Sequence, residues 1–410
     1  MDNRSGPQSS HRITSVRGSY TRRRHGRLLV QQDDEDEAPT IVGTDGPYLT
    51  DARGKRYLDF RSGWNVGNFG WNNRLLAEAV RTFQGPPYVY PEHRYEPWFE
   101  LAALLLDLAP RRLQRCFRAT GGTEAVDLAL QMAMRHTGRR EFIGLAGAYH
   151  GNSIAAMSIG ADADSRKELN LLSGCHQVDA PVNEKAVGKI ETLLKRHKIA
   201  AVILEPVSLN LGVRIPEAGA MSRVQELCRR HGALFIMDEV ACGFGRTGKI
   251  FASEHFDLDP DILCVAKAIT GGYAPMGAVL ASAPVAKSMA EDGEFYSTFG
   301  WHPLATHVAI ANVRAITRNK KALLRHTAAL SAHFEARLRT MPFKVEPRLN
   351  VIGLAIGVSL EDESYAKRIR AKCQDNGLLM AGDDGLSLFP PLTLDHDTAD
   401  EGLDILEDCL

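Results

Sequence analysis

The 410-residue sequence has no surplus of charge of either sign, since 49 Lys and Arg residues face 50 Asp and Glu residues and the formal net charge is -1. Nucleic acids and anionic membrane surfaces select proteins with a sustained basic field, which this composition does not supply. Long apolar runs are also missing: none approaches the ~20 residues that cross a bilayer, and the N-terminus has no apolar stretch typical of a signal peptide. We therefore expect a cytoplasmic protein whose partner is a small molecule, with no nucleic acid and no membrane.

Cys-x-x-Cys pairs are absent as well. The seven cysteines are scattered along the chain and odd in number: Cys116, Cys175, Cys228, Cys242, Cys264, Cys373 and Cys409. This distribution argues against a disulfide framework and against a structural zinc site, so the sequence predicts no metal centre. We interpret the cysteines as reduced thiols, most of which fill small spaces in the core.

The first 37 residues differ from the rest in their charge pattern. Residues 1–30 carry seven arginines against the single acid Asp2, and residues 33–37 are all acidic. Such a segment buries too little apolar surface to offset its chain entropy, which predicts a disordered tail over residues 1–37. An Arg-rich transit peptide is the lesser alternative, because of Asp2 and a weak amphipathic pattern.

The remaining chain predicts an α/β fold with two domains. Short apolar runs alternate with helix-length amphipathic stretches up to about residue 310, which is typical of a mostly parallel sheet covered by helices. The last hundred residues combine two helical patterns, 321–340 and 364–376, with short strands near Val345 and Leu354. We predict a segment at 38–85 that joins the small domain, a large domain at 86–310 and a small α+β domain at 311–410. The clearest predicted strands are 141–145, 200–204, 233–237 and 262–266.

Polar side chains follow these strands at the points where they end. They are Glu205, the pair Asp238-Glu239 and Lys267. Ligands of parallel sheets bind beyond the carboxyl ends of the strands, so these groups are expected to converge on one crevice. Burial would lower the pKa of a lysine there and make its neutral amine a nucleophile suited to Schiff-base chemistry. Spacing alone leaves a structural ion pair about equally acceptable.

A glycine pair precedes a strong helical pattern at residues 120–138. Thr120-Gly121-Gly122-Thr123 leads directly into that pattern, and Gly138 closes it. The unpaired N–H groups of a helix N-terminus and the helix dipole attract a phosphate, and the glycines permit close backbone approach. A plain glycine turn before a buried helix is the alternative.

A second glycine-rich run raises an alternative from another enzyme class. Residues 243–248, Gly-Phe-Gly-Arg-Thr-Gly, match the dinucleotide pattern G-x-G-x-x-G and would suit a nicotinamide oxidoreductase. The match is weak, because no good helix pattern follows and the next strand ends in Lys267 where an acid for the ribose belongs. The acidic pair Asp238-Glu239 would also lie beside the pyrophosphate. A tight loop under the crevice is the better interpretation.

Three segments in order resemble one known family. They are Asp238-Glu239-Val240, the run 243–248, and residues 266–278 with the sequence Ala-Lys-Ala-Ile-Thr-Gly-Gly-Tyr-Ala-Pro-Met-Gly-Ala. Together they are similar to the signature of class III (ω-type) aminotransferases, which are pyridoxal-phosphate (PLP) enzymes of fold type I. The similarity extends from residues 48–51 to residues 389–393. It implies a PLP-dependent transfer of an amino group from a small amine or amino acid to a keto acid.

The resemblance also implies roles for individual residues. Lys267 would form the Schiff base with pyridoxal 5'-phosphate and Asp238 would face the pyridine nitrogen. The cofactor ring would lie between Val240 and Tyr149, which His150 follows, and its phosphate on the loop of Gly121, Gly122 and Thr123. Thr298 would reach the phosphate of the neighbouring subunit, so that a homodimer shares its active sites. Trp64 and Glu205 would meet the substrate.

Several positions depart from the family pattern. Ala241 stands where many members have glutamine, Asn152 where some have a carboxylate-binding arginine, and Trp301-His302 replaces the usual Gly-Asn. Most informative is Ser387, because members that use 2-oxoglutarate have an arginine there that pairs with the glutamate at 205. Arg61 and Arg246 remain candidate partners for a substrate carboxylate.

The missing arginine keeps other chemistries on the same scaffold open. An aminomutase, an epimerase or a decarboxylase would share Lys267 and Asp238. A mutase or an epimerase needs no external 2-oxoglutarate, which is consistent with Ser387. An aminotransferase is the preferred prediction, and the donor, the acceptor and the pathway are not specified by the sequence.

Overall fold

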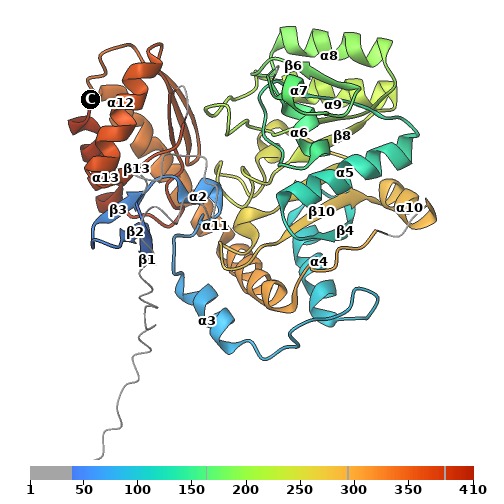
Figure 1. Cartoon of the computed structure of the whole chain (residues 1–410), viewed down its shortest axis with the longest axis horizontal. Coiled ribbons are helices and arrows are strands. Elements are labelled where there is room, and N and C mark those ends of the chain that lie inside the picture. The colour runs from blue at the N-terminus through green and yellow to red at the C-terminus, as the bar shows by residue number, and fades with distance from the viewer. Residues whose placement is uncertain (1–38, 163, 293–294, 383–384) are drawn as a thin grey trace, which may run out of the picture. The chain divides into compact units, whose positions relative to one another are not determined.

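The computed structural model describes residues 39–410 except residues 163, 293–294 and 383–384 (Figure 1). The chain divides into two units, residues 1–41 and residues 42–410. The predicted disordered tail at 1–37 lies outside the described residues. The features discussed below lie in the larger unit, apart from Ile41.

A seven-stranded sheet forms the centre of the larger unit. Its order is β4-β10-β9-β8-β7-β5-β6, in which β10 runs antiparallel to both β4 and β9 and the strands from β9 to β6 are parallel. The predicted α/β class is therefore confirmed, and the four clearest predicted strands match β5, β7, β8 and β9 to within one residue at each end. The strands are β4 (Leu113–Ala119), β5 (Glu141–Leu145), β6 (Cys175–Val178), β7 (Ile199–Leu204), β8 (Leu234–Asp238), β9 (Ile262–Val265) and β10 (Gly277–Ser282).

Helices bury both faces of this sheet, and alternate side chains of each strand enter different cores. Phe142 packs with α5 (Gly122–Thr137) and α6 (Ile154–Gly160), whereas its neighbour Ile143 packs with α8 (Glu184–Arg196) and α9 (Ala220–His231). Near β9, the sheet face that carries Ile143 is covered by α4 (Glu96–Leu108) and α11 (Pro303–Thr340). Because both faces are dry, polar side chains of these strands can meet water or ligands only at the strand ends.

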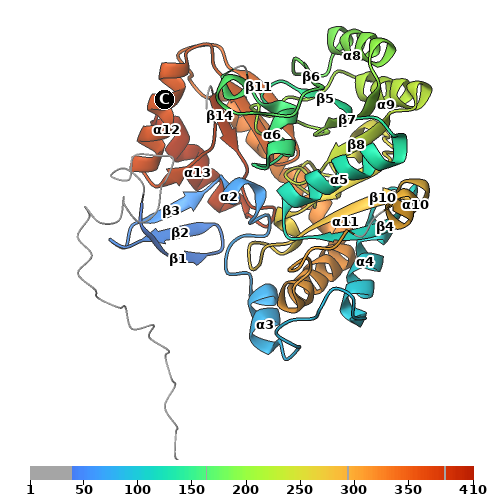
Figure 2. The same cartoon turned by 45° about the vertical axis from the view of Figure 1, so that its right-hand side comes forward.

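A second group of elements comes from the C-terminal hundred residues and the N-terminal strands. The antiparallel sheet β11 (Arg348–Ile352), β12 (Ala355–Ser359) and β14 (Gly385–Leu388) packs with α12 (Glu363–Asp375) and α13 (His396–Asp408). In a further sheet, β1 (Ile41–Asp45) and β2 (Tyr48–Asp51) are followed by β3 (Arg56–Asp59), which pairs in parallel with β13 (Leu378–Leu379). Figure 2 shows β2 and β3 beside α12 and α13. The exact domain boundaries stay a prediction, and α11 runs without a break through residue 310.

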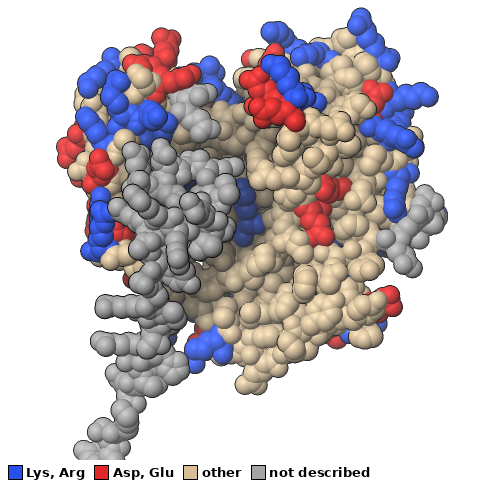
Figure 3. Space-filling view, in the orientation of Figure 1, with Lys and Arg blue, Asp and Glu red and all other residues tan. Residues whose placement is uncertain are grey.

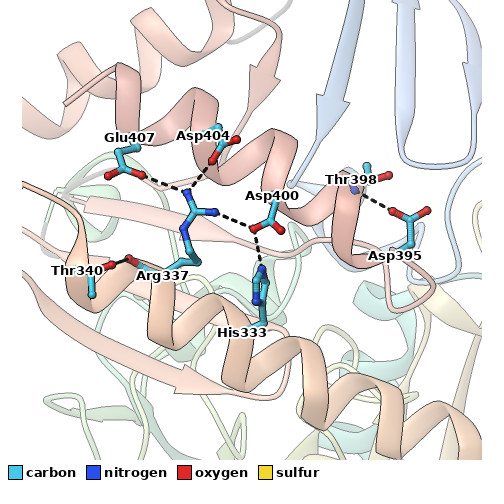
Figure 4. Close-up of polar contacts among 8 residues, drawn as sticks. All are labelled: His333, Arg337, Thr340, Asp395, Thr398, Asp400, Asp404 and Glu407. Atoms are coloured by element: carbon cyan, nitrogen blue, oxygen red, sulfur yellow. Dashed lines mark hydrogen bonds and ion pairs between the residues drawn. The ribbon is translucent and has the colours of Figure 1, made fainter.

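An ion-pair network fastens α13 to the second half of α11 (Figure 4). Arg337 donates to Asp400 at 2.7 Å, to Asp404 at 2.7 Å and to Glu407 at 3.1 Å, and His333 contacts the same oxygen of Asp400 at 2.8 Å. These charges are partly exposed, so each pair contributes little by itself. Their shared arginine nevertheless fixes the rotation of one helix against the other.

All seven cysteines are free, and five of them are buried, which confirms their interpretation as core thiols. Among the helices of the described residues, none combines the length and the hydropathy that a membrane span needs.

Candidate active site

A cavity of about 370 Å³ opens at the carboxyl ends of β5, β7, β8 and β9. This volume lies in the usual range for small-molecule sites. The residues of the described chain that line it include most of those predicted to hold the cofactor: Gly121, Gly122, Thr123, Tyr149, His150, Glu205, Asp238, Val240 and Lys267. The convergence expected from the strand ends is therefore present.

Lys267 stands two residues after the end of β9, in the short helix η2 (Lys267–Ile269). Its backbone has φ +45°, a left-handed conformation that a lysine rarely adopts and that often accompanies function. Burial lowers the pKa of its amine, and the negative charges of Glu205 and Asp238 oppose that shift only in part. A larger share of this amine is consequently neutral than in a solvent-exposed lysine.

Asp238 is the last residue of β8, and its carboxylate is held from two sides. The imidazole Nδ1 of His150 lies 2.7 Å from Oδ2, and the backbone N–H of Val240 donates to Oδ1 at 3.0 Å. Burial disfavours the protonated imidazole, but the hydrogen bond and the charge of Asp238 outweigh it and raise the pKa of His150. His150 Nε2 is buried and has no hydrogen-bond partner among the residues that the structure describes. The pair presents an oriented carboxylate to the cavity.

Glu205 follows β7 and is almost fully buried. Burial first, and then the charge of Asp238, raises the pKa of its carboxyl group to about 8, while His150 and Lys267 lower it. The N–H of Leu209 donates weakly to Oε2 at 3.4 Å, whereas Oε1 has no hydrogen-bond partner in the described part of the chain. This side chain, which lines the cavity, therefore keeps its proton to a higher pH than an exposed glutamate does.

The glycine pair begins α5 as the sequence predicts. Gly121 is an extended N-cap without a side-chain cap, so the first N–H groups of the helix remain open toward the cavity. A Cβ at Gly122 would lie only 2.9 Å from Cγ1 of Val240, and a Cβ at Gly151 only 2.5 Å from Oγ1 of Thr123. These close approaches bring the helix N-terminus, the Val240 side chain and the loop after β5 around a common space.

Two of the predicted contacts do not line this cavity in the described chain. Thr298 is exposed on a turn, beside the buried Ser297, which donates to Glu124 of α5 at 3.2 Å. Trp64 has φ +57° and lies against Phe389, with ring centroids 6.1 Å apart. Val66, from the same segment as Trp64, lines the cavity in its place.

The candidate arginines do not reach the cavity either. Arg246 is fully buried and donates to Leu354 O at 2.9 Å, Pro390 O at 2.6 Å and Asn68 Oδ1 at 2.8 Å. Burial lowers the pKa of its guanidinium to about 9. The prediction that it could bind a substrate carboxylate is at odds with these contacts, because the side chain is committed to joining three chain segments. Arg61 precedes the short helix α2 (Ser62–Asn65) and is not among the lining residues.

Three other departures from the family pattern also have a structural account. Ser387 is buried in β14, where its backbone pairs with that of Ala381. Trp301 belongs to the core, and its indole N–H donates to Gly277 O at 2.8 Å. Ala241 lines the cavity without any polar side-chain atom.

The run 243–248 forms consecutive turns and opens no α-helix. Its positive φ values include Phe244, Gly245 and Gly248. The neighbouring Glu239 points away into the core, where it accepts the N–H groups of Ala252 at 2.9 Å and Ser253 at 2.7 Å. A dinucleotide site of the nicotinamide type requires a helix here, so the loop interpretation is the one that the geometry supports.

Some residues that line the cavity are not predicted from the sequence. Val66 gave no signal, whereas Thr270, Gly272, Ala274, Pro275 and Met276 lie inside the family-like run 266–278 and could have been singled out from it. These residues form the loop between η2 and β10, on the side of the cavity next to Lys267.

Comparison with known proteins decides the family. The model of the family "Aminotransferase class-III" matches residues 30–410. The chain belongs to the class III aminotransferases. An acetylornithine aminotransferase of Methanopyrus kandleri is 34% identical over 90% of this chain and 94% of its own, and one of Archaeoglobus fulgidus is 33% identical over 88% and 93%.

Solved structures agree with this membership. A taurine:2-oxoglutarate aminotransferase from Bifidobacterium kashiwanohense, in complex with PLP and glutamate, has a TM-score of 0.87 and 26% identity, with 94% of this chain and 95% of that one covered. A PLP-bound amine transaminase from an uncultivated Pseudomonas species has a TM-score of 0.84 and 31% identity, with 93% and 96% covered. This class III aminotransferase therefore has fold type I, uses pyridoxal 5'-phosphate and transfers amino groups.

The residues of the cavity fit that cofactor. The open N–H groups of α5 suit a phosphate, the carboxylate of Asp238 suits a protonated ring nitrogen, and the partly neutral amine of Lys267 suits an aldehyde. The partnerless Nε2 of His150 and Oε1 of Glu205 mark buried polar atoms to which a bound molecule could supply a partner.

Proposed function

We propose that Lys267 and Asp238 carry the chemistry of amino-group transfer in this chain. One observation carries the assignment: a buried amine with a lowered pKa and an oriented carboxylate line the same cavity. When bound, the cofactor supplies an aldehyde that combines with amines and a cationic ring that withdraws electrons from the substrate carbon. Lys267 would hold the cofactor covalently, and Asp238 would keep its ring nitrogen protonated.

Lys267 is also the proposed proton carrier. A neutral amine accepts a proton from a carbon acid, and the same group, once protonated, returns it to a neighbouring carbon as a general acid. Burial lowers the pKa of this amine toward the working pH, which favours both directions. The charges of Glu205 and Asp238 oppose this shift only in part, so the pKa of the amine stays lowered.

The other lining residues are proposed to bind and orient. Gly121, Gly122 and Thr123 would donate to the phosphate from the N-terminus of α5. The side chains of Val240 and Tyr149 would cover the two faces of the ring. His150 positions Asp238 through its 2.7 Å contact and adds a positive charge behind the carboxylate.

We further propose a homodimer in which Thr298 reaches the phosphate site of the partner subunit. Exposed aromatic side chains support such an interface: Tyr88, Tyr90, Phe99, Tyr296 and Phe299. Figure 3 shows few charges over the lower right of the molecule, where Figure 1 has α4. A hollow of about 870 Å³ lies beside Tyr90 and Tyr296. The cytoplasmic location stays a prediction.

Mixing two inactive variants tests the shared site. A Lys267→Ala subunit retains Thr298, and a Thr298→Ala subunit retains Lys267, so hybrid dimers contain one site with both residues. Expected is an increase in cofactor retention and turnover on mixing and refolding, compared with Thr298→Ala alone. An unchanged mixture, or a monomer by sedimentation, would contradict the shared site but not the role of Lys267.

For the substrates, we propose a small amine or amino acid as donor and a keto acid with a single carboxylate as acceptor. The carboxyl group of Glu205 interacts with Leu209, Asp238, His150 and Lys267, and Ser387 stands where an arginine would pair with it. A site without that arginine has no fixed cation for a second carboxylate. Trp64 and Glu205 would border the donor.

An aminomutase is the second candidate, and the same serine at 387 favours it. Purified enzyme should be incubated with a panel of donors that includes acetylornithine and taurine, with and without pyruvate or 2-oxoglutarate. Product that forms only with an acceptor, and faster with pyruvate, supports the proposal. Equal rates with 2-oxoglutarate would refute the acceptor class, and isomerised product without any acceptor would favour the mutase.

A further inference from the structure

Two histidines and a glutamate meet at the opposite edge of the central sheet from the cofactor cavity. Oε2 of Glu141 lies 2.7 Å from Nε2 of His176 and 3.0 Å from Nδ1 of His197. The three ligand atoms all lie within 4.8 Å of one another, and the two imidazole rings have centroids 4.2 Å apart. All three side chains are partly buried.

We propose that Glu141, His176 and His197 bind one divalent transition-metal ion of the zinc type. Two imidazoles and one carboxylate are a ligand set that zinc adopts, with a water molecule in the open fourth position. Hard cations such as Mg²⁺ and Ca²⁺ prefer oxygen ligands only, so they fit this set poorly. The absence of a metal centre is predicted from the spacing of the cysteines alone. This cluster contains no cysteine, so that spacing gives no information about it.

The two separations from Glu141 need only a small adjustment, and the separation between the two imidazole nitrogens is at most 4.8 Å. Around a tetrahedral zinc ion with bonds of ~2.0–2.1 Å, ligand atoms stand about 3.3 Å apart. The two contacts of Glu141 must therefore open by roughly half an ångström, which side-chain rotation of partly exposed groups allows. On binding, the ion takes the place of the protons that join the imidazoles to the carboxylate. In a neutral ring that proton moves to the other ring nitrogen, and only a protonated ring releases a proton to solvent.

The backbone holds the three ligands in register. Glu141 begins β5, and it pairs with Ile199 at the start of β7, two residues after His197. On the other side of β5, His176 of β6 pairs with Ile143. Two of the ligands stand on neighbouring strands, and His197 caps the C-terminus of α8 just before a third strand, so all three are pre-organised and little chain entropy opposes binding.

The proposed metal site lies at the opposite end of β5 from the cofactor cavity. Glu141 is the first residue of β5 and Leu145 the last, which corresponds to a rise of roughly 13 Å. The cofactor cavity begins only beyond Leu145. A bound ion would therefore fasten the amino ends of β5, β6 and β7 together and stabilise the folded chain, because it binds the folded state alone.

Calorimetric titration with zinc chloride tests the proposal. The PLP-loaded full-length protein is first freed of metal with a chelator and kept at pH 7.5 in a buffer that does not bind metals. Expected is one saturable site per chain and a higher melting temperature with zinc. His197→Ala and Glu141→Gln should each weaken binding at least tenfold and remove the rise in melting temperature.

A matched control locates the site. His136→Ala removes another histidine, one that contacts Ser288 outside the cluster, and should leave zinc affinity unchanged. Melting curves without zinc verify that each variant folds, and Glu141→Gln preserves side-chain shape should a histidine variant not fold. Absence of a saturable site, or equal affinity in both cluster variants and wild type, overturns the proposal.

Discussion

The two edges of the central sheet hold polar groups in opposite states. At the carboxyl edge, Lys267 and Glu205 are enclosed and burial displaces their pKa values. Oε1 of Glu205 has no hydrogen-bond partner within the described ranges. At the amino edge, Glu141 is partly exposed, and its contacts with His176 and then His197 lower its pKa. Unsatisfied, desolvated groups cost stability and are retained where a ligand completes them. The difference supports the proposal that the carboxyl edge is the reacting site.

The largest expected effect comes from Lys267→Ala. Turnover should fall at least about a thousandfold, because the proposed nucleophile and proton carrier is lost. The melting temperature of the cofactor-free protein should change little, since the amine contributes no satisfied hydrogen bond. Steady-state rates and thermal melts measure both. Turnover close to that of wild type would show that the reaction does not depend on Lys267 and would contradict a reacting site at the carboxyl edge.

Asp238→Asn should have the next largest effect, a loss of about a hundredfold in kcat. The amide keeps the shape but cannot hold a proton on the ring nitrogen by its charge. The pKa of His150 should fall, because its raised value depends on Asp238. Kinetics, together with NMR titration of His150, measure the two consequences. A lower kcat with an unchanged imidazole pKa would refute the coupling of this pair.

Glu205→Gln should stabilise the cofactor-free protein increasingly as the pH rises from about 5 to 8. Below the usual pKa near 4.5, Glu205 is protonated in both the folded and the unfolded wild-type chain, so the variant is not more stable than wild type there. Between 4.5 and about 8 the unfolded chain ionises while the folded chain keeps its proton, so wild-type stability is lost. We expect about 1–3 kcal/mol at pH 8, measured by denaturant unfolding. A constant difference across this range would contradict the buried neutral acid.

Glu141→Gln, at the amino edge, should lower the free energy of unfolding, whereas Glu205→Gln raises it. This change should be the smallest of the four. A pKa that is lowered in the folded state contributes stability above the usual value of 4.5, and that stability is lost as the pH falls through the folded pKa. In the presence of chelator, the variant should therefore lose less than about 1 kcal/mol at pH 7 and nothing under acid conditions. A loss as large at low pH as at pH 7 would assign the effect to packing.

The sequence predicts the carboxyl edge well for a physical reason. A strand buried on both faces is an uninterrupted apolar run, so the polar residue that follows, such as Glu205 or Lys267, marks its end. Val66 and Trp301 follow no such rule, because their positions depend on where distant segments pack. Arg246 has the pattern of a binding residue, but tertiary contacts make it a structural one.

The amino edge is predicted poorly for the complementary reason. His176 and His197 meet Glu141 only because β5 lies between β6 and β7, an order that differs from the order along the chain. The spacing of these residues along the sequence does not predict that strand order. Sheet order, rather than local pattern, brings these side chains together.

Borohydride reduction followed by peptide mapping tests the central claim most directly. Reduction should bleach the absorbance band of the purified holoenzyme and fix the cofactor covalently in the peptide that contains Lys267. The Lys267→Ala protein should show no such fixation. Cofactor attached to a different lysine, or none attached in wild type, would contradict the account.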